Sequence, residues 1–265
     1  MQRVKSTTIH DLLGAFDHPS SALFRAIELR QIYEGCKDIE FKTPSLDIGC
    51  GDGKIAAILF DSRFTYGVDN GEANDYQIAI EKNRYDKVLL ESAERMSLPD
   101  KSVNFVFSNS VLEHIPDIYS VFKETSRVLA GGGYFVFTTP TKYFKKYINL
   151  SKVLGPMGLN ILNRLYSVFR NKALNHYHLY DHQFYKETLG QYGFEIVKYS
   201  YSVSEEALKA WDLMARRIKV LKLFGVNIEA ELKERQTQRI IDLYEKDKLG
   251  KSEGANLLII SQKRS

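Results

Sequence analysis

The chain has 265 residues, of which 44% are hydrophobic and 26% charged, and its formal net charge at pH 7 is +4. This composition is typical of a globular protein long enough to bury the core of one α/β domain with an added cap. No apolar run approaches the roughly 18–20 residues that a membrane span needs, and no signal-peptide pattern follows the first residues. The two cysteines, Cys36 and Cys50, are too few for a disulfide framework, so we expect a reducing, cytoplasmic setting.

Strand and helix patterns alternate along the first half of the chain. Residues 1–19 are expected to form an irregular arm, and a helix is expected to begin at Pro19. Beyond it, hydrophobic periodicity and turn residues predict five strands with helices between them. The strands cover 43–48, 64–69, 87–90, 103–108 and 134–138, and the helices 54–61, 75–83 and 117–129, the last ended by glycines 131–133. This alternation predicts a parallel sheet covered on both faces.

The second half of the chain departs from this pattern. A helix is expected over 184–192, a strand over 194–200, mostly helix over 205–245 and a last strand over 255–261. We therefore divide the chain into six segments. These are an N-terminal arm and helix (1–40), a ligand-binding core (41–140), a basic amphipathic insert (141–182), a core helix and sixth strand (183–202), a second helical insert (203–252) and the last core strand (253–265).

A glycine-rich loop follows the first predicted strand, with glycines at every second position: Gly49, Gly51 and Gly53. Glycine lets the backbone approach a ligand closely and tolerates positive φ. The spacing differs from the G-x-G-x-x-G fingerprint of dinucleotide sites, whose third glycine would stand where this chain has Lys54. Carboxylates end the first two strands, at Asp47 and Asp69, where open parallel sheets bind their ligands. We interpret the loop as a site for an adenosine-type ligand.

Four features occur in a characteristic order: the loop at 46–53, Asp69, the segment 91–99 and the turn 109–115. Together they resemble the class I S-adenosylmethionine-dependent methyltransferases, most closely the broad small-molecule group of methyltransferase type 11. The resemblance covers residues 20–140 and the last two strands. It implies an α/β fold with a Rossmann-like, seven-stranded, mostly parallel sheet, helices on both faces and a helical cap from two insertions. It also implies S-adenosyl-L-methionine as cofactor and S-adenosyl-L-homocysteine as product.

The resemblance also implies a set of cofactor-binding residues. The three loop glycines would pass close to the methionine and ribose parts, Asp47 would hold the loop through backbone amides, and Asp69 would accept from both ribose hydroxyls. Ser92 and Ala93 would border the adenine, although the family usually has Asp at the position of Ser92. The remaining candidates are Asn109 and Ser110 near the methyl group, with Cys50 and Asn70 as neighbours of the loop and of Asp69.

Four residues are candidates for catalysis or acceptor contact: Glu113, His114, His176 and His178. Methyl transfer needs mainly alignment of donor and acceptor, but a hydroxyl acceptor also requires a base. The alternatives are structural: Glu113 and His114 would hold the turn before Pro116, and His176 and His178 would be polar residues before the next helix. His176 and His178 would share a face of an extended chain, but a metal site needs more ligands, so the sequence predicts none.

Two stretches combine basic and apolar residues. Residues 141–180 carry seven Lys or Arg and no Asp or Glu, and 207–224 has a similar pattern. If the last strand is antiparallel, as the family implies, both stretches leave the same edge of the sheet and roof one cleft. We then expect a small-molecule, lipid-linked or sugar-linked acceptor with an anionic part and an apolar body, and a peripheral membrane contact through 141–172. The alternative is two ordinary cap helices with solvated basic faces.

The sequence therefore predicts methyl transfer to a small-molecule or lipid-associated acceptor, with oxygen as the methylated atom. Nucleic-acid methylation is an alternative, because basic inserts could follow phosphates. The modest net charge and the missing Asn/Asp-Pro-Pro-aromatic tetrapeptide after the fourth strand count against it. A non-catalytic cofactor-binding scaffold is the other alternative. The sequence gives no indication of the oligomeric state.

Overall fold

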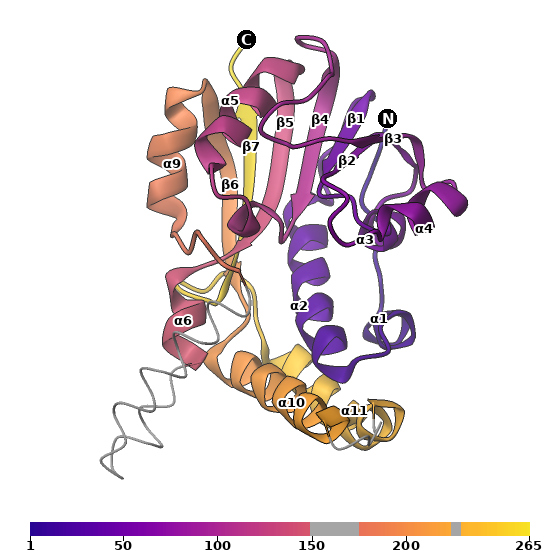
Figure 1. The fold of residues 1–265 in the computed structure, drawn as a ribbon. Coiled ribbons are helices and arrows are strands. Elements are labelled where there is room, and N and C mark those ends of the chain that lie inside the picture. Colours follow the sequence, from indigo (N-terminus) through magenta and orange to yellow (C-terminus); the bar gives the residue numbers. More distant parts are fainter. Residues whose placement is uncertain (149–174, 224–228) are drawn as a thin grey trace.

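The computed structural model describes residues 1–148, 175–223 and 229–265, and shows one seven-stranded sheet with helices on both faces (Figure 1). The strand order is β3-β2-β1-β4-β5-β7-β6. The strands are β1 (Ser45–Ile48), β2 (Phe64–Asp69), β3 (Tyr85–Leu90), β4 (Val103–Asn109), β5 (Leu129–Pro140), β6 (Phe194–Ser202) and β7 (Asn256–Lys263). The helices are α1 (Ile9–Ala15), α2 (Pro19–Cys36), α3 (Lys54–Leu59), α4 (Tyr76–Glu81), η1 (Leu112–His114), α5 (Ile118–Val128), α6 (Lys142–Ile148), α9 (His182–Gln191), α10 (Glu205–Leu223) and α11 (Glu229–Lys246).

The first five strands pair in parallel, and β7 is antiparallel to both of its neighbours, β5 and β6. The predicted α/β sheet is confirmed, including its antiparallel last strand. Pro140 at the end of β5 and Ser202 at the end of β6 both pair with Asn256. The chain therefore leaves the sheet at the same edge before α6 and before α10, and α6 and α10 contact each other there.

Alternating side chains divide the core into two clusters, one on each face of the sheet. Phe105 and Phe107 of β4 pack with the helices α1, α2 and α3, whereas Val106 between them packs with α5 and α9. The same alternation runs through the central strands β5 and β7, whose side chains are almost fully buried. This burial of apolar surface on both faces is the main stabilising term of the fold.

The longest helix against the sheet, α2, also reaches beyond it. Pro19 occupies its first turn, where a missing N–H is harmless. Buried residues line the helix from end to end, and it contacts α10 and α11 below the sheet (Figure 1). α2 therefore connects the sheet core to the helices at its carboxyl edge.

Two predictions of local structure were wrong. Residues 1–19 were expected to be irregular, but Thr8 and Asp11 form a capping box that starts α1, and Leu12 is buried. Glycines 131–133 were expected to end a helix, but α5 ends at Val128 and these glycines lie inside β5. A β-carbon on Gly133 would lie 2.8 Å from the carbonyl oxygen of Asn104, so glycine is needed for close strand approach.

The described part of the basic insert is short. Only its first residues, in α6, and its last, 175–182, are described, so most of the predicted membrane-contacting segment 141–172 lies outside the described residues. Within the parts of the chain that the structure covers, no helix has the length and apolar character to cross a membrane.

Candidate active site

A cleft of about 230 Å³ opens at the carboxyl ends of β1 and β4. β1 pairs with β2 on one side and β4 on the other, so the strand order reverses here, where α/β sheets typically bind ligands. The cleft is lined by Arg25, Asp47, Gly49, Cys50, Gly51, Asp52, Ile55, Asp75, Phe107, Asn109, Ser110 and Val111. A second hollow of about 350 Å³ lies near Phe64 and Lys82, at the opposite edge of the sheet, and contains none of the predicted site residues.

The glycine loop has the conformation that its sequence predicts. Gly49, Gly51 and Gly53 have φ values of +72°, +46° and +68°, a region that residues with a β-carbon rarely adopt. A β-carbon on Gly49 would lie 2.3 Å from a methyl carbon of Val111, whereas one on Gly51 would meet nothing within 4 Å. Gly49 therefore brings β1 close to the turn after β4, and Gly51 leaves open space beside the cleft.

Asp69 holds the loop from the end of β2. One carboxylate oxygen accepts from the Gly51 N–H at 3.0 Å, and the other accepts from the Gly71 N–H at 2.9 Å. Each oxygen has a second lone pair for a further donor. The carboxylate can thus fix the loop and still accept from hydroxyl groups of a ligand. This arrangement fits the ribose of an adenosine-type cofactor.

Asp47 has a different partner from the one that we expected. Its carboxylate accepts from the Tyr85 hydroxyl at 2.6 Å, and the loop amide of Gly51 is bound by Asp69 instead. The expected role of Asp47 in holding loop amides is corrected accordingly. Burial raises the pKa of the Asp47 carboxyl to about 7, with the Asp69 charge adding to the rise and the Tyr85 hydrogen bond opposing it.

Sequence analysis missed two residues of α2: Arg25, which lines the cleft, and Glu28, which is buried next to it. The Arg25 guanidinium donates to the Asn109 side-chain oxygen at 2.9 Å and pairs with Glu28. Glu28, fully buried, accepts from the hydroxyls of Ser110 at 2.7 Å and Thr138 at 2.8 Å. The available signal was a charged residue, Glu28, between the apolar neighbours of a core helix. This network fixes Asn109 and Ser110, and it puts the guanidinium of Arg25, paired with Glu28, in the lining of the cleft.

The other predicted cofactor residues lie beside the cleft rather than in its lining. Ser92 is exposed and donates to Glu94, and Ala93 is buried in the adjacent core. Asn70 is exposed, and its side-chain oxygen accepts from the backbone of Glu72. Cys50 does line the cleft, and burial raises the pKa of its thiol.

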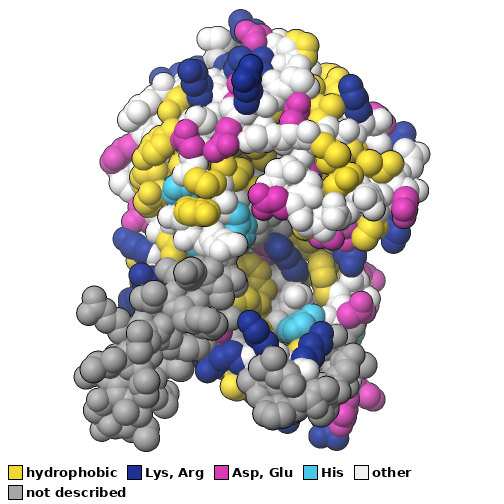
Figure 2. All heavy atoms as spheres, in the orientation of Figure 1, with side chains coloured by type: hydrophobic (Ala, Val, Ile, Leu, Met, Phe, Trp, Pro, Cys, Tyr) yellow, Lys and Arg dark blue, Asp and Glu magenta, His cyan; other side chains and the backbone are white. Residues whose placement is uncertain are grey.

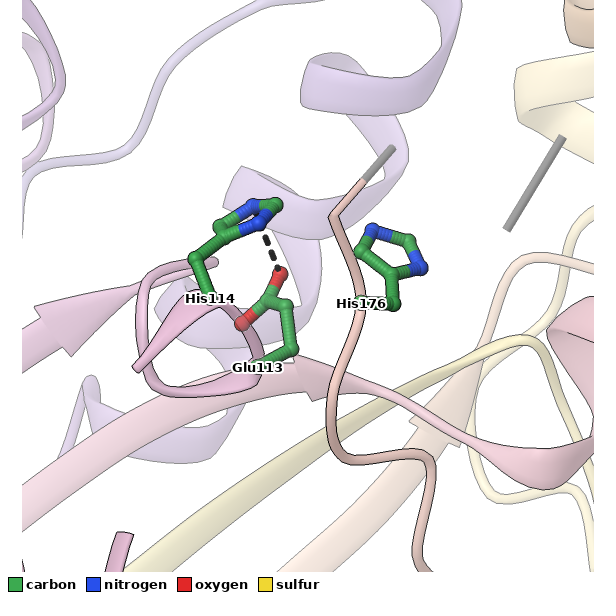
Figure 3. Close-up of side chains that lie close together, drawn as sticks. All are labelled: Glu113, His114 and His176. Carbon is green, nitrogen blue, oxygen red and sulfur yellow. Dashed lines mark ion pairs between the residues drawn. The ribbon is translucent and has the colours of Figure 1, made fainter. Parts of the chain in front are cut away.

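Three of the four catalytic candidates converge in space. Glu113 and His114 lie on η1, and His176 lies on the coil before α9 (Figure 3). The His114 Nε2 atom is 3.8 Å from a Glu113 carboxylate oxygen, and the rings of His114 and His176 are 5.2 Å apart. We call these three residues the Glu-His-His cluster. His178 is not part of it.

His178 has a structural position. Its Nε2 atom lies 2.9 Å from the Ile115 carbonyl and 3.1 Å from the Pro116 carbonyl, and the residue is 8% exposed. An N–H at this atom donates to the turn before α5, the structural role that sequence analysis considered for His114. His182 is the first residue of α9, two residues before the predicted start of this helix.

Burial dominates the electrostatics of the Glu-His-His cluster. It raises the pKa of the Glu113 carboxyl to about 8, and a smaller opposing effect comes from the charge of Arg25. Burial also lowers the pKa of His114, and the Arg25 charge lowers it further. Both shifts favour the uncharged form of the respective group.

A row of aromatic side chains from three helices begins at the cluster. The Phe144 ring of α6 is 5.2 Å from the His176 ring and 5.7 Å from the Trp211 ring of α10, which in turn is 6.1 Å from Phe24 of α2. Figure 2 shows this face hollowed below the sheet, with histidine and basic side chains along the hollow. Some of the nearby cations are paired: Lys142 with Asp181 at 2.6 Å.

Comparisons with known proteins find similarity to methyltransferases. Residues 46–137 match the family model described as a methyltransferase domain. Over 100 residues the chain is 35% identical to a protein of Mycolicibacterium smegmatis named "Probable S-adenosylmethionine-dependent methyltransferase", covering 37% of this chain and 38% of that one. Over 97 residues it is 35% identical to the 27-O-demethylrifamycin SV methyltransferase of Amycolatopsis mediterranei, covering 33% and 35%. The matches thus span little more than a third of these relatives.

A solved structure of an S-adenosylmethionine-dependent methyltransferase from Thermotoga maritima superimposes with a TM-score of 0.57 at 19% identity. The superposition covers 92% of this chain and 93% of that chain. This likeness shows a shared fold, the one that this solved methyltransferase also has. Residues 46–137 match a methyltransferase-domain model and are similar to S-adenosylmethionine-dependent methyltransferases, in agreement with the resemblance seen in the sequence.

Proposed function

We propose that this protein transfers the methyl group of S-adenosylmethionine to an oxygen atom of a small-molecule acceptor that combines an anionic part with an apolar body. The single observation that carries the proposal is the loop at 49–53, held by Asp69 and opening on the same cleft as Asn109 and Ser110. Cofactor and acceptor groups can meet at this edge of the sheet.

The cleft and the end of β2 beside it offer groups for each end of the cofactor. Asp69 provides acceptors for the ribose hydroxyls, and Gly51 leaves room beside the loop. Arg25 is the cation in the cleft, with 28% of its side chain exposed, and we assign it to the carboxylate of the methionine part. These contacts would hold the cofactor by its ribose and by its carboxylate, on the two sides of the sulfur that carries the methyl group.

The reaction needs alignment more than chemical assistance. The sulfonium is already an activated donor, so the protein holds acceptor oxygen, methyl carbon and sulfur in line, and such positioning contributes roughly 7–11 kcal/mol in favourable cases. Asn109 and Ser110 are well placed for this task because the buried Glu28 and Thr138 fix both side chains. Ser110 has φ +53°, an uncommon conformation for a residue other than glycine.

The acceptor class follows from the side chains beside the Glu-His-His cluster. Phe24, Phe144 and Trp211 form a row of aromatic contacts there. Lys145, Lys146 and Arg217 add exposed cations on the neighbouring helices, whereas Arg216 is paired with Asp212 at 3.1 Å. Oxygen as the methylated atom is also the chemistry in the name of the Amycolatopsis relative, whose acceptor lacks a methyl group on an oxygen.

The proposal is tested with radiolabelled S-adenosylmethionine and matched acceptors: aryl and alkyl hydroxy acids, their neutral amides, and their O-methyl ethers. We expect methyl incorporation into the hydroxy acids, about tenfold less into the amides and none into the ethers. Transfer to the ethers would place the methyl on the carboxylate. Incorporation confined to amines or nucleic acid would contradict the proposal.

A further inference from the structure

The Glu-His-His cluster has the composition of a metal site. One carboxylate oxygen of Glu113 and one ring nitrogen each of His114 and His176 all lie within 4.8 Å of one another (Figure 3). At metal–ligand distances of about 2.1 Å, two ligand atoms of a tetrahedral site are about 3.4 Å apart. Small side-chain rotations are enough to bring three donors from this spacing to a common ion.

The surroundings orient these donors. The His114 Nδ1 atom lies 3.2 Å from the Asn175 carbonyl oxygen, so an N–H there donates to it and Nε2 keeps its lone pair for the cluster. A carbonyl behind a ligating imidazole is the usual outer partner of a metal-bound histidine. The next peptide is fixed as well, because the Tyr177 N–H donates to the Glu113 carbonyl oxygen at 2.8 Å. The coil that carries His176 is thus attached to η1 on both sides of that residue.

Glu113 lacks a partner that a buried carboxyl group needs. Its side chain is 3% exposed, and its Oε2 atom has no hydrogen-bond partner among the described residues. Buried polar atoms are nearly always satisfied, and an unpaired one costs about 1–3 kcal/mol. A bound cation would satisfy this oxygen. This orphaned atom is an observation independent of the clustering itself.

The donor types select the ion. Two imidazoles and one carboxylate suit Zn²⁺ and related first-row metals, whereas Mg²⁺ and Ca²⁺ prefer oxygen ligands throughout. Three protein ligands leave a tetrahedral ion with one open position, as in catalytic zinc sites. We propose that Glu113, His114 and His176 bind one divalent transition-metal ion of the Zn²⁺ type and leave a coordination position for an acceptor oxygen.

The consequence for catalysis rests on the proposed function. A metal ion can lower the pKa of a bound water from 15.7 to about 7, and the hydroxyl of a bound acceptor would be acidified in the same way. Its proton leaves to water, the oxygen forms a bond to the methyl carbon, and the carbon–sulfur bond breaks with its electron pair on sulfur. The products are the methylated acceptor and neutral S-adenosylhomocysteine, so charge and atoms balance.

The test is calorimetric titration of Zn²⁺ into tag-free, chelator-treated protein. We expect the wild type to bind one equivalent of Zn²⁺ with micromolar or tighter affinity. The affinity should be weaker on the order of hundredfold or more in Glu113→Gln and His176→Ala, because the loss of a hydrogen-bond partner of a ligand already lowers metal affinity about 10–100-fold. His10→Ala, which removes an exposed histidine of α1, is the matched control and should bind as the wild type does. Equal Zn²⁺ binding in all four proteins, or no binding in the wild type, would overturn the proposal.

A second measurement covers the case in which a cluster variant does not fold. Co²⁺ added to the wild type should give visible d–d absorption without the near-ultraviolet band of a thiolate, which excludes Cys50 as the ligand. A thiolate band, or no visible absorption, would contradict the proposal. S-adenosylhomocysteine titrated into the same metal-free protein reports the cofactor cleft separately, so a failed metal site and a failed cofactor site are distinguishable.

Discussion

The two halves of the carboxyl edge of this sheet are built differently. On the cofactor side, after β1 and β2, the site consists mainly of backbone: three glycines with positive φ and loop amides held by Asp69. On the acceptor side, after β4 and β5, it consists of side chains from distant parts of the chain, such as His114 beside His176. The comparison teaches that a backbone site leaves a local motif in the sequence, whereas a side-chain site depends on tertiary contacts.

The largest expected effect comes from the backbone of the cofactor side. Gly49→Ala would place a β-carbon 2.3 Å from Val111 at a φ of +72°. Strain from positive φ and overpacking together should lower the free energy of unfolding by about 2–5 kcal/mol and abolish S-adenosylhomocysteine binding. Urea denaturation and calorimetry measure the two effects.

Gly132→Ala is the matched control, because it has a similar φ of +75° and no atom within 4 Å of the added β-carbon. It should cost only the strain of about 1–2 kcal/mol and leave binding unchanged. If both substitutions behaved alike, close approach of the loop to Val111 would be irrelevant.

The next effect concerns the buried carboxyl beneath the loop. The pKa of Asp47 is raised from 3.8 to about 7, so between about pH 4 and 7 the folded protein keeps a proton that the unfolded chain has lost. The contribution of Asp47 to stability therefore falls as pH rises through this window, by up to about 4 kcal/mol in total, and is level above pH 7.

Asp47→Asn keeps an acceptor for the Tyr85 hydroxyl but cannot titrate. The difference in free energy of unfolding between this variant and the wild type should shift in favour of the variant from pH 4.5 to pH 7.5, as measured by urea denaturation. An advantage that is independent of pH would show that Asp47 titrates normally.

A smaller effect separates the two ends of the cofactor. Arg25→Gln removes the cation of the cleft, so it should weaken S-adenosylhomocysteine about tenfold, or 1.4 kcal/mol. Methylthioadenosine lacks the amino-acid part and should bind both proteins equally by calorimetry. If the substitution weakened both ligands alike, Arg25 would act on the shape of the cleft rather than on the carboxylate.

The smallest effect is expected on the acceptor side. Replacing Lys145, Lys146 and Arg217 by Gln should raise KM for an anionic acceptor a few-fold through lost long-range attraction, with the affinity for S-adenosylhomocysteine unchanged. Added salt should produce the same rise in the wild type. A control variant removes three exposed cations elsewhere, at Lys82, Lys87 and Lys123. The same change in KM in this control would mean that the total charge of the protein, and not the cations of the cap, determines the attraction of the acceptor.

Sequence patterns predicted the fold well because they are local. Alternating apolar residues, glycines and strand-ending carboxylates identified the seven strands and the topology that the family implies. Contacts across the chain were not predictable in this way: the partner of Asp47 is Tyr85 in β3, 38 residues away, and Arg25 reaches Asn109 across 84 residues. No spacing rule links such residues.

The histidines show the same limit at shorter range. His176 and His178 alternate, and an extended chain would place them on one face. The segment is an irregular coil instead, so His178 binds the carbonyls before α5 while His176 joins the Glu-His-His cluster. The rule that every second side chain lies on the same face holds for strands, and this segment is not a strand.

The most direct test of the account is calorimetric titration of S-adenosylhomocysteine into the wild type, Asp69→Asn and the exposed control Glu72→Gln. We predict micromolar binding to the wild type and to Glu72→Gln. Binding to Asp69→Asn should be at least tenfold weaker, because the amide has only one oxygen that can accept hydrogen bonds from the loop and the ribose, whereas the carboxylate has two. Absence of binding to the wild type, or equal binding to all three, would contradict the claim that the loop after β1 and Asp69 form the cofactor site.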